Sequence, residues 1–155
     1  MCHFETGDLR VKVNGKKDFD LVILGAVGHI FGDYQSTIKA LAGCLNPDGC
    51  IIIDDAYIED GSGYEHEIYK SRSVMMNQIS DAMAVLRDEI IPDSEKTSER
   101  NQEMFDVINK RAAELMEQNP QDKILIENYI KRQQEENSIL AGKVVVTTML
   151  LSLKK

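Results

Sequence analysis

Two short stretches of the sequence place chemically useful residues directly after apolar runs. The apolar run 21–24 is followed by Gly-Ala-Val-Gly and then His29, and the apolar run 50–53 is followed by Asp54 and Asp55, with Tyr57 two residues later. Glycine lets a backbone approach a ligand closely. Imidazole exchanges a proton near neutral pH. These residue types suit proton transfer beside a ligand that lies against the ends of two strands.

Both stretches also have a structural interpretation. Glycines after a strand can simply form a tight turn that His29 caps, and the spacing alone favours this simpler interpretation. Asp54 and Asp55 are consecutive, so in an extended segment their side chains point to opposite faces. They therefore do not form a pair of carboxylates acting on one bond. Ligand binding and a structural role at a strand end remain equally good explanations for each of them.

The spacing of possible metal ligands argues against a metal site. There are three cysteines and three histidines: Cys2, Cys44, Cys50, His3, His29 and His66. They include no Cys-x-x-Cys pair, and the residue four positions after His66 is Lys70, where a zincin helix has its second histidine. The sequence predicts no metal and no disulfide framework.

The first half of the chain has the pattern of a strand–helix–strand unit. Residues 19–24 are apolar almost throughout, as in a parallel strand covered on both faces. Asp33 is a suitable N-cap for an amphipathic helix that follows. The turn sequence Asn-Pro-Asp-Gly at 46–49 precedes a second apolar run at 50–53. We therefore expect two parallel strands joined by a right-handed helical crossover.

The second half predicts helices followed by a final strand. We expect a helix over about 65–81, a strand or helix over 84–91 that Pro92 ends, and a strand over 143–153. Between them, residues 93–141 are charge-rich and form two helical patterns separated by Asn119 and Pro120. The expected fold class is α/β, with residues 1–155 as a single domain and 93–141 as a helical-hairpin insertion within it.

The charge balance limits the classes of partner. The formal net charge is -8, whereas binding to nucleic acid or to an acidic membrane surface needs an excess of Lys and Arg. No apolar run reaches the length of a membrane span. We expect a cytoplasmic protein that binds neither nucleic acid nor membrane.

Taken in order, several segments resemble the class I S-adenosylmethionine-dependent methyltransferases. Residues 4–8 (Phe-Glu-Thr-Gly-Asp) are similar to the family's third strand, and 19–23 (Phe-Asp-Leu-Val-Ile) to its fourth. Residues 41–53 (Leu-Ala-Gly-Cys-Leu-Asn-Pro-Asp-Gly-Cys-Ile-Ile-Ile) resemble the family pattern LARVLKPGGRLVI. Residues 144–155 look like its last, antiparallel strand. The resemblance implies part of a Rossmann-like sheet, mostly parallel with an antiparallel C-terminal strand.

The resemblance also implies roles for individual residues. The cofactor would be S-adenosylmethionine and the acceptor a small molecule. The residues expected near the cofactor are Asp8 and Leu9, which would flank adenine, and Leu24, Gly25 and Ala26, which would line the methionine side. The residues expected to face the acceptor are His29, Asp55 and Tyr57, with His29 as the general base.

One part of the family pattern has no counterpart here. The first strand with its glycine-rich turn would precede Phe4. We therefore expect a truncated member or fragment of the family. The alternative is a non-catalytic, degenerate domain that acts only in oligomerisation. Half of another Rossmann-like protein, such as a nicotinamide enzyme, is a third possibility, but it does not account for residues 45–49 or for the last strand.

Lack of the first strand has a consequence for assembly. In the family, the fourth strand pairs with that missing strand, so 19–24 would have an exposed apolar edge. Residues 9–13 could cover it as a hairpin partner through the turn sequence Asn14-Gly15. Alternatively, two copies could pair, edge to edge or through the long helical hairpin. We expect a homodimer or a higher oligomer.

Overall fold

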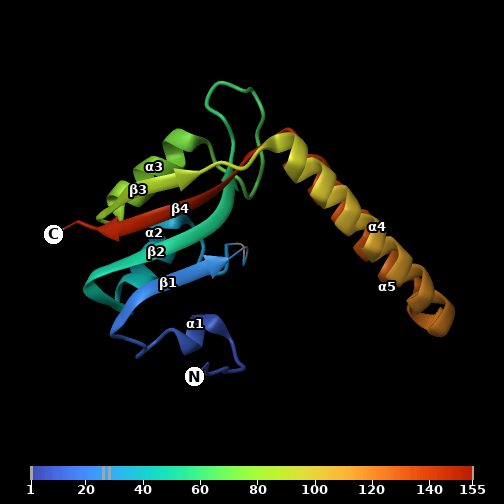
Figure 1. The fold of residues 1–155 in the computed structure, drawn as a ribbon, viewed down its shortest axis with the longest axis horizontal. Coiled ribbons are helices and arrows are strands. Elements are labelled where there is room, and N and C mark those ends of the chain that lie inside the picture. The colour runs from blue at the N-terminus through green and yellow to red at the C-terminus, as the bar shows by residue number, and fades with distance from the viewer. Residues whose placement is uncertain (1, 26, 28, 155) are drawn as a thin grey trace. The chain divides into compact units, whose positions relative to one another are not determined.

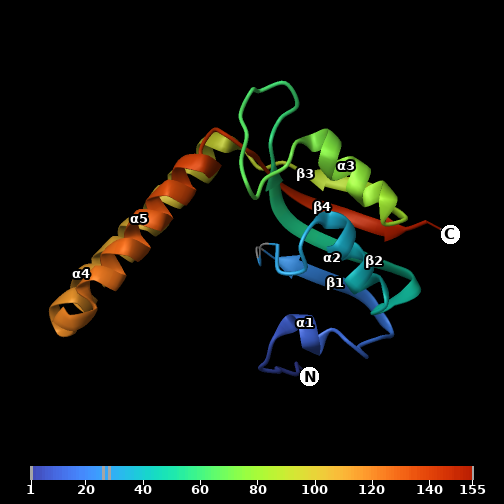
Figure 2. The same cartoon turned by 180° about the vertical axis from the view of Figure 1, so that it is seen from behind.

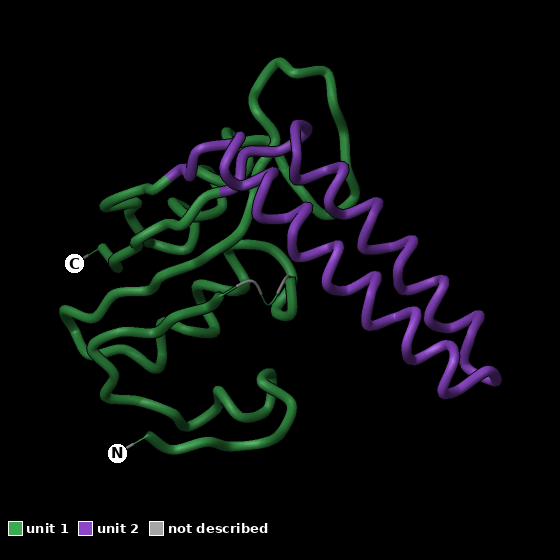
Figure 3. The backbone as a smooth tube through the Cα atoms, turned by 45° about the vertical axis from the view of Figure 1, so that its right-hand side comes forward, with its two compact units in different colours: residues 1–90, 147–155 green, residues 91–146 purple. Residues whose placement is uncertain are grey.

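The computed structural model describes residues 2–25, 27 and 29–154. Its helices and strands follow one another as α1 (Leu9–Lys12), β1 (Phe19–Gly25), α2 (Tyr34–Ala42), β2 (Leu45–Tyr57), α3 (Arg72–Asp81), β3 (Ala84–Ile90), α4 (Ser94–Gln118), the 3-10 helix η1 (Pro120–Asp122), α5 (Lys123–Leu140) and β4 (Val145–Leu153). Residues 1–90 and 147–155 form one compact unit, and residues 91–146 form a second (Figure 3).

The strands of the first unit form one sheet in the order β1-β2-β4-β3. β1 and β2 are parallel, whereas β4 is antiparallel to β3 (Figure 1). The chain reaches the middle of this sheet last, because β4 inserts between β2 and β3. The predicted α/β class is confirmed: most strands are parallel and the C-terminal strand is antiparallel.

The core of this unit lies between the sheet and two helices. Helices α2 and α3 lie on the same face of the sheet (Figure 2). The most deeply buried side chains come from these helices and from the central strands: Ile38, Ile51, Met75, Ile79, Thr147, Met149 and Leu151. On β2 the buried and half-buried positions alternate over residues 50–54, which is the pattern of a sheet with one well-covered face.

Helix α2 forms where the sequence predicts it. The side chain of Asp33 accepts a hydrogen bond from the backbone N–H of Ser36 at 2.8 Å, which satisfies one of the free donors of the first turn. Tyr34, Ile38 and Leu41, three or four residues apart, are all buried. The N-cap and the apolar stripe are therefore both confirmed.

The prediction of a strand β1 buried on both faces is wrong. Leu24 is buried, but Phe19, Leu21 and Ile23 have exposed fractions of 44%, 45% and 63%. The physical reason is position: β1 is at the edge of the sheet, and alternate side chains point to the face that α2 and α3 leave uncovered. An apolar run predicts a strand but does not show whether a second layer covers it.

The predicted turn at 46–49 is instead an irregularity inside β2. Phe19 pairs with Leu45 and Leu21 pairs with Cys50, so residues 46–49 of β2 lie opposite the single residue Asp20 of β1. A Cβ at Gly49 would lie only 2.9 Å from the carbonyl oxygen of Phe19. Glycine is therefore required at this position by the close approach of the two backbones.

The amino-terminal segment differs from both predictions made for it. Residues 4–8 form no strand, and Leu9–Lys12 is a short helix rather than one arm of a hairpin. The side chain of Asp8 accepts a hydrogen bond from the backbone N–H of Arg10 at 2.9 Å and caps this helix. The capping interaction outweighed the weaker extended pattern of the segment.

The predicted helix over 65–81 is shorter than expected. It begins only at Arg72, where the Ser71 hydroxyl accepts the backbone N–H of Val74. Residues 65–70 are irregular, and His66 Nδ1 there accepts the backbone N–H groups of Ile68 and Tyr69 at 3.2 and 3.3 Å. These local side-chain bonds compete with a helical turn.

The second unit is the helical hairpin of α4 and α5, linked by η1 at Pro120. Phe105 and Ala112 of α4 are buried, while Ile124, Leu125 and Tyr129 of α5 are exposed. Two long helices therefore occupy most of the region where the sequence predicted a helical hairpin. No helix in the described part of the chain is both long and apolar enough to cross a membrane.

Candidate functional site

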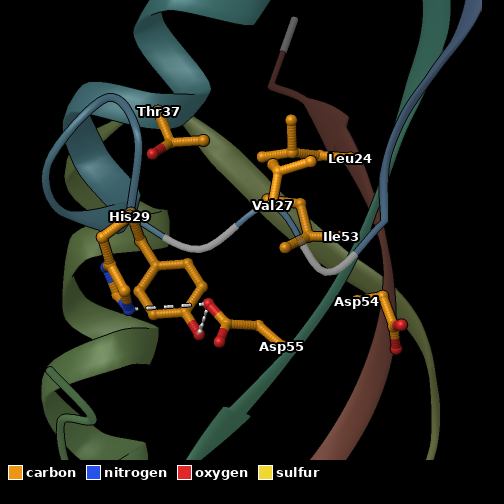
Figure 4. A pocket seen from close by; sticks show the side chains of 8 residues that line it. Leu24, Val27, His29, Thr37, Ile53, Asp54 and Asp55 are labelled. Carbon is orange, nitrogen blue, oxygen red and sulfur yellow. Dashed lines mark hydrogen bonds and ion pairs between the residues drawn. The ribbon is translucent and has the colours of Figure 1, made fainter. Parts of the chain in front are cut away.

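The carboxyl ends of β1 and β2 lie side by side. Leu24 pairs with Ile53 and Gly25 pairs with Asp54. A small cavity of about 10 Å³ lies just beyond, which is space for about one water molecule. Its wall consists of Leu24, Val27, His29, Tyr34, Thr37, Ile53, Asp54 and Asp55 (Figure 4). The two stretches noted in the sequence therefore meet, as expected for parallel neighbouring strands.

His29 presents one ring nitrogen to the protein and the other to the cavity. Its Nδ1 lies 3.0 Å from the carbonyl oxygen of Gly32. Since a carbonyl only accepts hydrogen bonds, Nδ1 carries a proton. Nε2 is buried and has no hydrogen-bond partner among the described residues. It lies 3.8 Å from Oδ2 of Asp55. In neutral His29, Nε2 is therefore a free basic nitrogen.

Tyr34 holds the carboxylate of Asp55 in place. Its hydroxyl donates a hydrogen bond of 2.9 Å to Oδ2 of Asp55, and the ring meets His29 edge to face, with centroids 5.9 Å apart. Burial, and then the nearby Asp55 charge, raise the pKa of Tyr34 well above its usual range. The phenol therefore stays protonated and acts as a donor to the carboxylate.

Asp54 and Asp55 point to opposite faces, as predicted. Asp55 meets Tyr34 on the face that α2 covers, whereas Asp54 accepts a hydrogen bond of 2.9 Å from the hydroxyl of Thr148 on β4. Figure 4 shows the two carboxylates turned away from each other. Asp55 is thus the carboxylate that faces His29.

The structure does not bring Tyr57 to this cavity. Its hydroxyl accepts a hydrogen bond of 2.7 Å from Arg72, and the Arg72 guanidinium lies 5.0 Å from the ring centre. Arg72 also donates two hydrogen bonds, of 2.9 and 2.7 Å, to Glu89. Tyr57 is only 2% exposed. It belongs to a separate polar cluster, here named the Arg72 cluster: Tyr57, Arg72, Glu89 and Thr147.

The described residues that were expected to bind the cofactor lie in two separate places. Leu24 lines the cavity and Gly25 adjoins it. Ala26 lies outside the described residues. Asp8 forms an ion pair of 2.7 Å with Arg10, and Leu9 lines a different groove beside the start of β1. Asp8 and Leu9 therefore lie apart from the others.

Tyr34 was not among the residues that the sequence predicted for the site. The available signal was a tyrosine in the first turn of a helix, shortly after a histidine that follows a strand.

A groove of about 300 Å³ also adjoins His29 and was not predicted from the sequence. The residues that line it are His29, Gly32, Asp33, Glu67, Ile68, Lys70 and Gln78. Across the described residues, no three His, Cys, Asp or Glu side chains are grouped so that they could hold a metal ion.

Comparison with solved structures identifies the fold. An S-adenosylmethionine-dependent methyltransferase from Geobacter sulfurreducens, crystallised with S-adenosylhomocysteine, superposes on 98% of this chain with a TM-score of 0.74 and 14% identity. A methyltransferase from Thiobacillus denitrificans, also with S-adenosylhomocysteine, covers 97% with a TM-score of 0.70 and 14% identity. The chain has the methyltransferase fold.

This methyltransferase fold extends beyond the length of the present chain, which covers 64% of each of those two proteins. A phosphoethanolamine N-methyltransferase from Haemonchus contortus has the same fold, with a TM-score of 0.60 and 14% identity over 90% of this chain and 34% of its own. No family model matches the sequence. No curated protein matches it either.

Proposed function

We propose that this chain transfers a methyl group from S-adenosylmethionine to a small-molecule acceptor. The observation that carries the proposal is the free Nε2 of His29, buried beside Asp55 at the ends of β1 and β2. In open α/β sheets, ligands bind outside the carboxyl ends of the strands. Similar folds crystallised with S-adenosylhomocysteine support the choice of cofactor.

The cofactor would lie over the strand ends rather than inside the cavity, since a volume of about 10 Å³ holds about one water molecule. Leu24 would contact its methionine side. Gly25 leaves room for it, because a Cβ at this position would meet no atom within 4 Å. Among the predicted cofactor residues, Leu24 and Gly25 are therefore the ones that we retain for this role.

In the reaction, a lone pair of the acceptor attacks the methyl carbon, and the electrons of the carbon–sulfur bond return to sulfur. The products are the methylated acceptor and S-adenosylhomocysteine. Nε2 of His29 takes the proton that the acceptor loses. Asp55, at 3.8 Å from this nitrogen, stabilises the resulting imidazolium. Tyr34 acts as a positioning residue through its hydrogen bond to Asp55.

The groove of about 300 Å³ beside His29 is the proposed acceptor site. Its volume is at the lower end of the range for small-molecule pockets. Asp33, Glu67 and Lys70 are among the residues that line it, and the acceptor that we propose for it is a small molecule. We further propose that the protein is cytoplasmic, in keeping with its free Cys2, Cys44 and Cys50. We also propose that residues 1–155 form one methyltransferase-like domain, with residues 93–141 as an insertion in it.

Calorimetric titration with S-adenosylhomocysteine tests the proposal. We expect saturable binding by the wild type and its loss in Gly25→Leu, whose side chain would occupy the cofactor position. Gly43→Leu is the matched control: it also has open space around its Cβ, and it lies at the far end of α2. No binding at millimolar ligand would favour the alternative of a non-catalytic methyltransferase-like domain. Binding of a nicotinamide dinucleotide instead would favour a different Rossmann-like enzyme.

A further inference from the structure

The side chain of Gln78 on α3 binds the beginning of α2 with one half of its amide group. The backbone N–H of Tyr34 donates a hydrogen bond of 3.2 Å to Oε1 of Gln78. A backbone N–H can only donate, so the atom that it meets is the amide oxygen. This bond therefore fixes which way the amide is turned, and it leaves the NH₂ group for another partner.

The NH₂ group of Gln78 donates no hydrogen bond to any described residue. It is also not buried, because Nε2 of His29 is the one buried side-chain nitrogen or oxygen without a partner in the described part of the chain. Gln78 lines the groove of about 300 Å³ beside His29. Its side chain therefore offers a hydrogen-bond donor to a molecule bound in this groove.

Gln78 is better fixed than the charged side chains of the same groove. Asp33 and Glu67 are carboxylates, which only accept hydrogen bonds when ionised. Lys70 is exposed, and its Nζ already donates a hydrogen bond of 2.7 Å to the carbonyl oxygen of Glu67. Gln78 is half-buried and held by Tyr34. A donor that is already held loses less conformational freedom when a ligand binds.

We infer that Gln78 selects the acceptor by donating a hydrogen bond to it. The acceptor then carries an ether, carbonyl or hydroxyl oxygen in addition to the group whose proton His29 takes. Tyr34 fixes the spacing of the two side chains, because its backbone holds Gln78 and its ring contacts His29. The role in methyl transfer rests on the proposed function, whereas the binding of such an oxygen by Gln78 does not.

The first test compares two neutral alcohols of equal length. Methoxyethanol has an ether oxygen where butanol has a methylene group, so it offers Gln78 one additional hydrogen-bond acceptor. Nuclear magnetic resonance follows the side-chain NH₂ signal of Gln78 during titration with each alcohol. We expect methoxyethanol to shift this signal at about tenfold lower concentration than butanol, which is the effect of one net hydrogen bond.

The second test inverts the hydrogen-bonding character of this one side chain. Gln78→Glu keeps an oxygen for the backbone N–H of Tyr34 but replaces the donor by a second acceptor. The missing NH₂ signal of this variant also identifies that of Gln78. We expect the variant to lose the preference for methoxyethanol, followed through the backbone signal of Tyr34. Asn77→Asp is the matched control, with the same change of charge at an exposed position of α3, and it should keep the preference. Circular dichroism checks that both variants are folded.

Three outcomes would overturn the role of Gln78. They are equal responses of the wild type to the two alcohols, no response to either, and a preference for methoxyethanol that survives in Gln78→Glu. The proposed function fails on a different measurement, the calorimetric titration with S-adenosylhomocysteine. A wild type that prefers methoxyethanol but binds no S-adenosylhomocysteine would keep the oxygen-binding groove and exclude its use in methyl transfer.

Discussion

Two polar clusters among the described residues have opposite properties. In the Arg72 cluster each side chain has a hydrogen-bond partner: Arg72 binds both Glu89 and Tyr57, and Thr147 donates a hydrogen bond of 3.0 Å to Glu89. In the cluster at the ends of β1 and β2, Nε2 of His29 has no hydrogen-bond partner among the described residues.

The difference indicates separate purposes. A buried polar group without a partner costs free energy, so a protein gains nothing in stability from leaving one. A fully bonded cluster rigidifies the fold. The difference is in keeping with the proposal that His29, Asp55 and Tyr34 carry out the chemistry, and with a structural role for the Arg72 cluster, although the sequence offered Tyr57 and Asp55 as equivalent candidates.

The largest expected effect is on catalysis. His29→Asn keeps a donor toward the Gly32 carbonyl but removes the basic nitrogen. We expect methyl transfer to fall by roughly 100-fold or more, with little change in stability or in binding of S-adenosylhomocysteine. The measurement is release of S-adenosylhomocysteine with a panel of small amines, alcohols and thiols. The control is His3→Asn, whose side chain is 82% exposed. Unchanged turnover in His29→Asn would exclude the general-base role.

The next effect is on stability. Glu89→Gln removes the charge that pairs with Arg72. We expect the free energy of unfolding to fall by about 2 kcal/mol. This loss is smaller than for a fully buried ion pair, because Arg72 retains some contact with water. Urea denaturation measures this loss. Glu114→Gln breaks the exposed ion pair with Arg111, and it should change stability by less than about 0.5 kcal/mol. Equal losses in both variants would contradict the structural role.

The stabilisation by Glu89 should also depend on pH. The hydrogen bonds from Arg72 lower the pKa of Glu89 below its ordinary value of 4.5, against the opposing effect of burial. A lowered pKa in the folded state stabilises the protein above the unfolded value and ceases to do so as pH falls through the folded value. The stability difference between wild type and Glu89→Gln should therefore be constant from about pH 6 to 8 and become small near pH 3. A difference independent of pH would exclude this ion pair as its source.

The smallest expected effect comes from Tyr34→Phe. The variant loses the hydrogen bond to Asp55 but keeps the buried ring, so we expect a loss of about 1 kcal/mol in stability and a moderate fall in turnover. Tyr129→Phe, at an exposed position of α5, is the control and should change neither. A Tyr34→Phe protein with wild-type turnover would show that Asp55 needs no support for its role.

Local sequence determined much of the fold and part of the site. β1, α2 and the strand at 50–53 follow from apolar runs, the Asp33 cap and helical spacing, and each depends on residues only a few positions apart. The same holds for α4 and α5, which meet at Pro120. The meeting of His29 with Asp55 was also predictable, because the carboxyl ends of adjacent parallel strands lie at one edge of a sheet.

Tertiary structure decided the rest, because burial and partners depend on residues far apart in the chain. Tyr57 was separated from the site by Arg72 and by Glu89, which is 17 residues beyond Arg72. Tyr34 gained its role from Asp55, 21 residues away. The exposure of β1 depends on which layers cover the sheet, and an apolar run carries no such information. Spacing along the chain shows what a residue can do, whereas the partners that folding brings to it decide what it does.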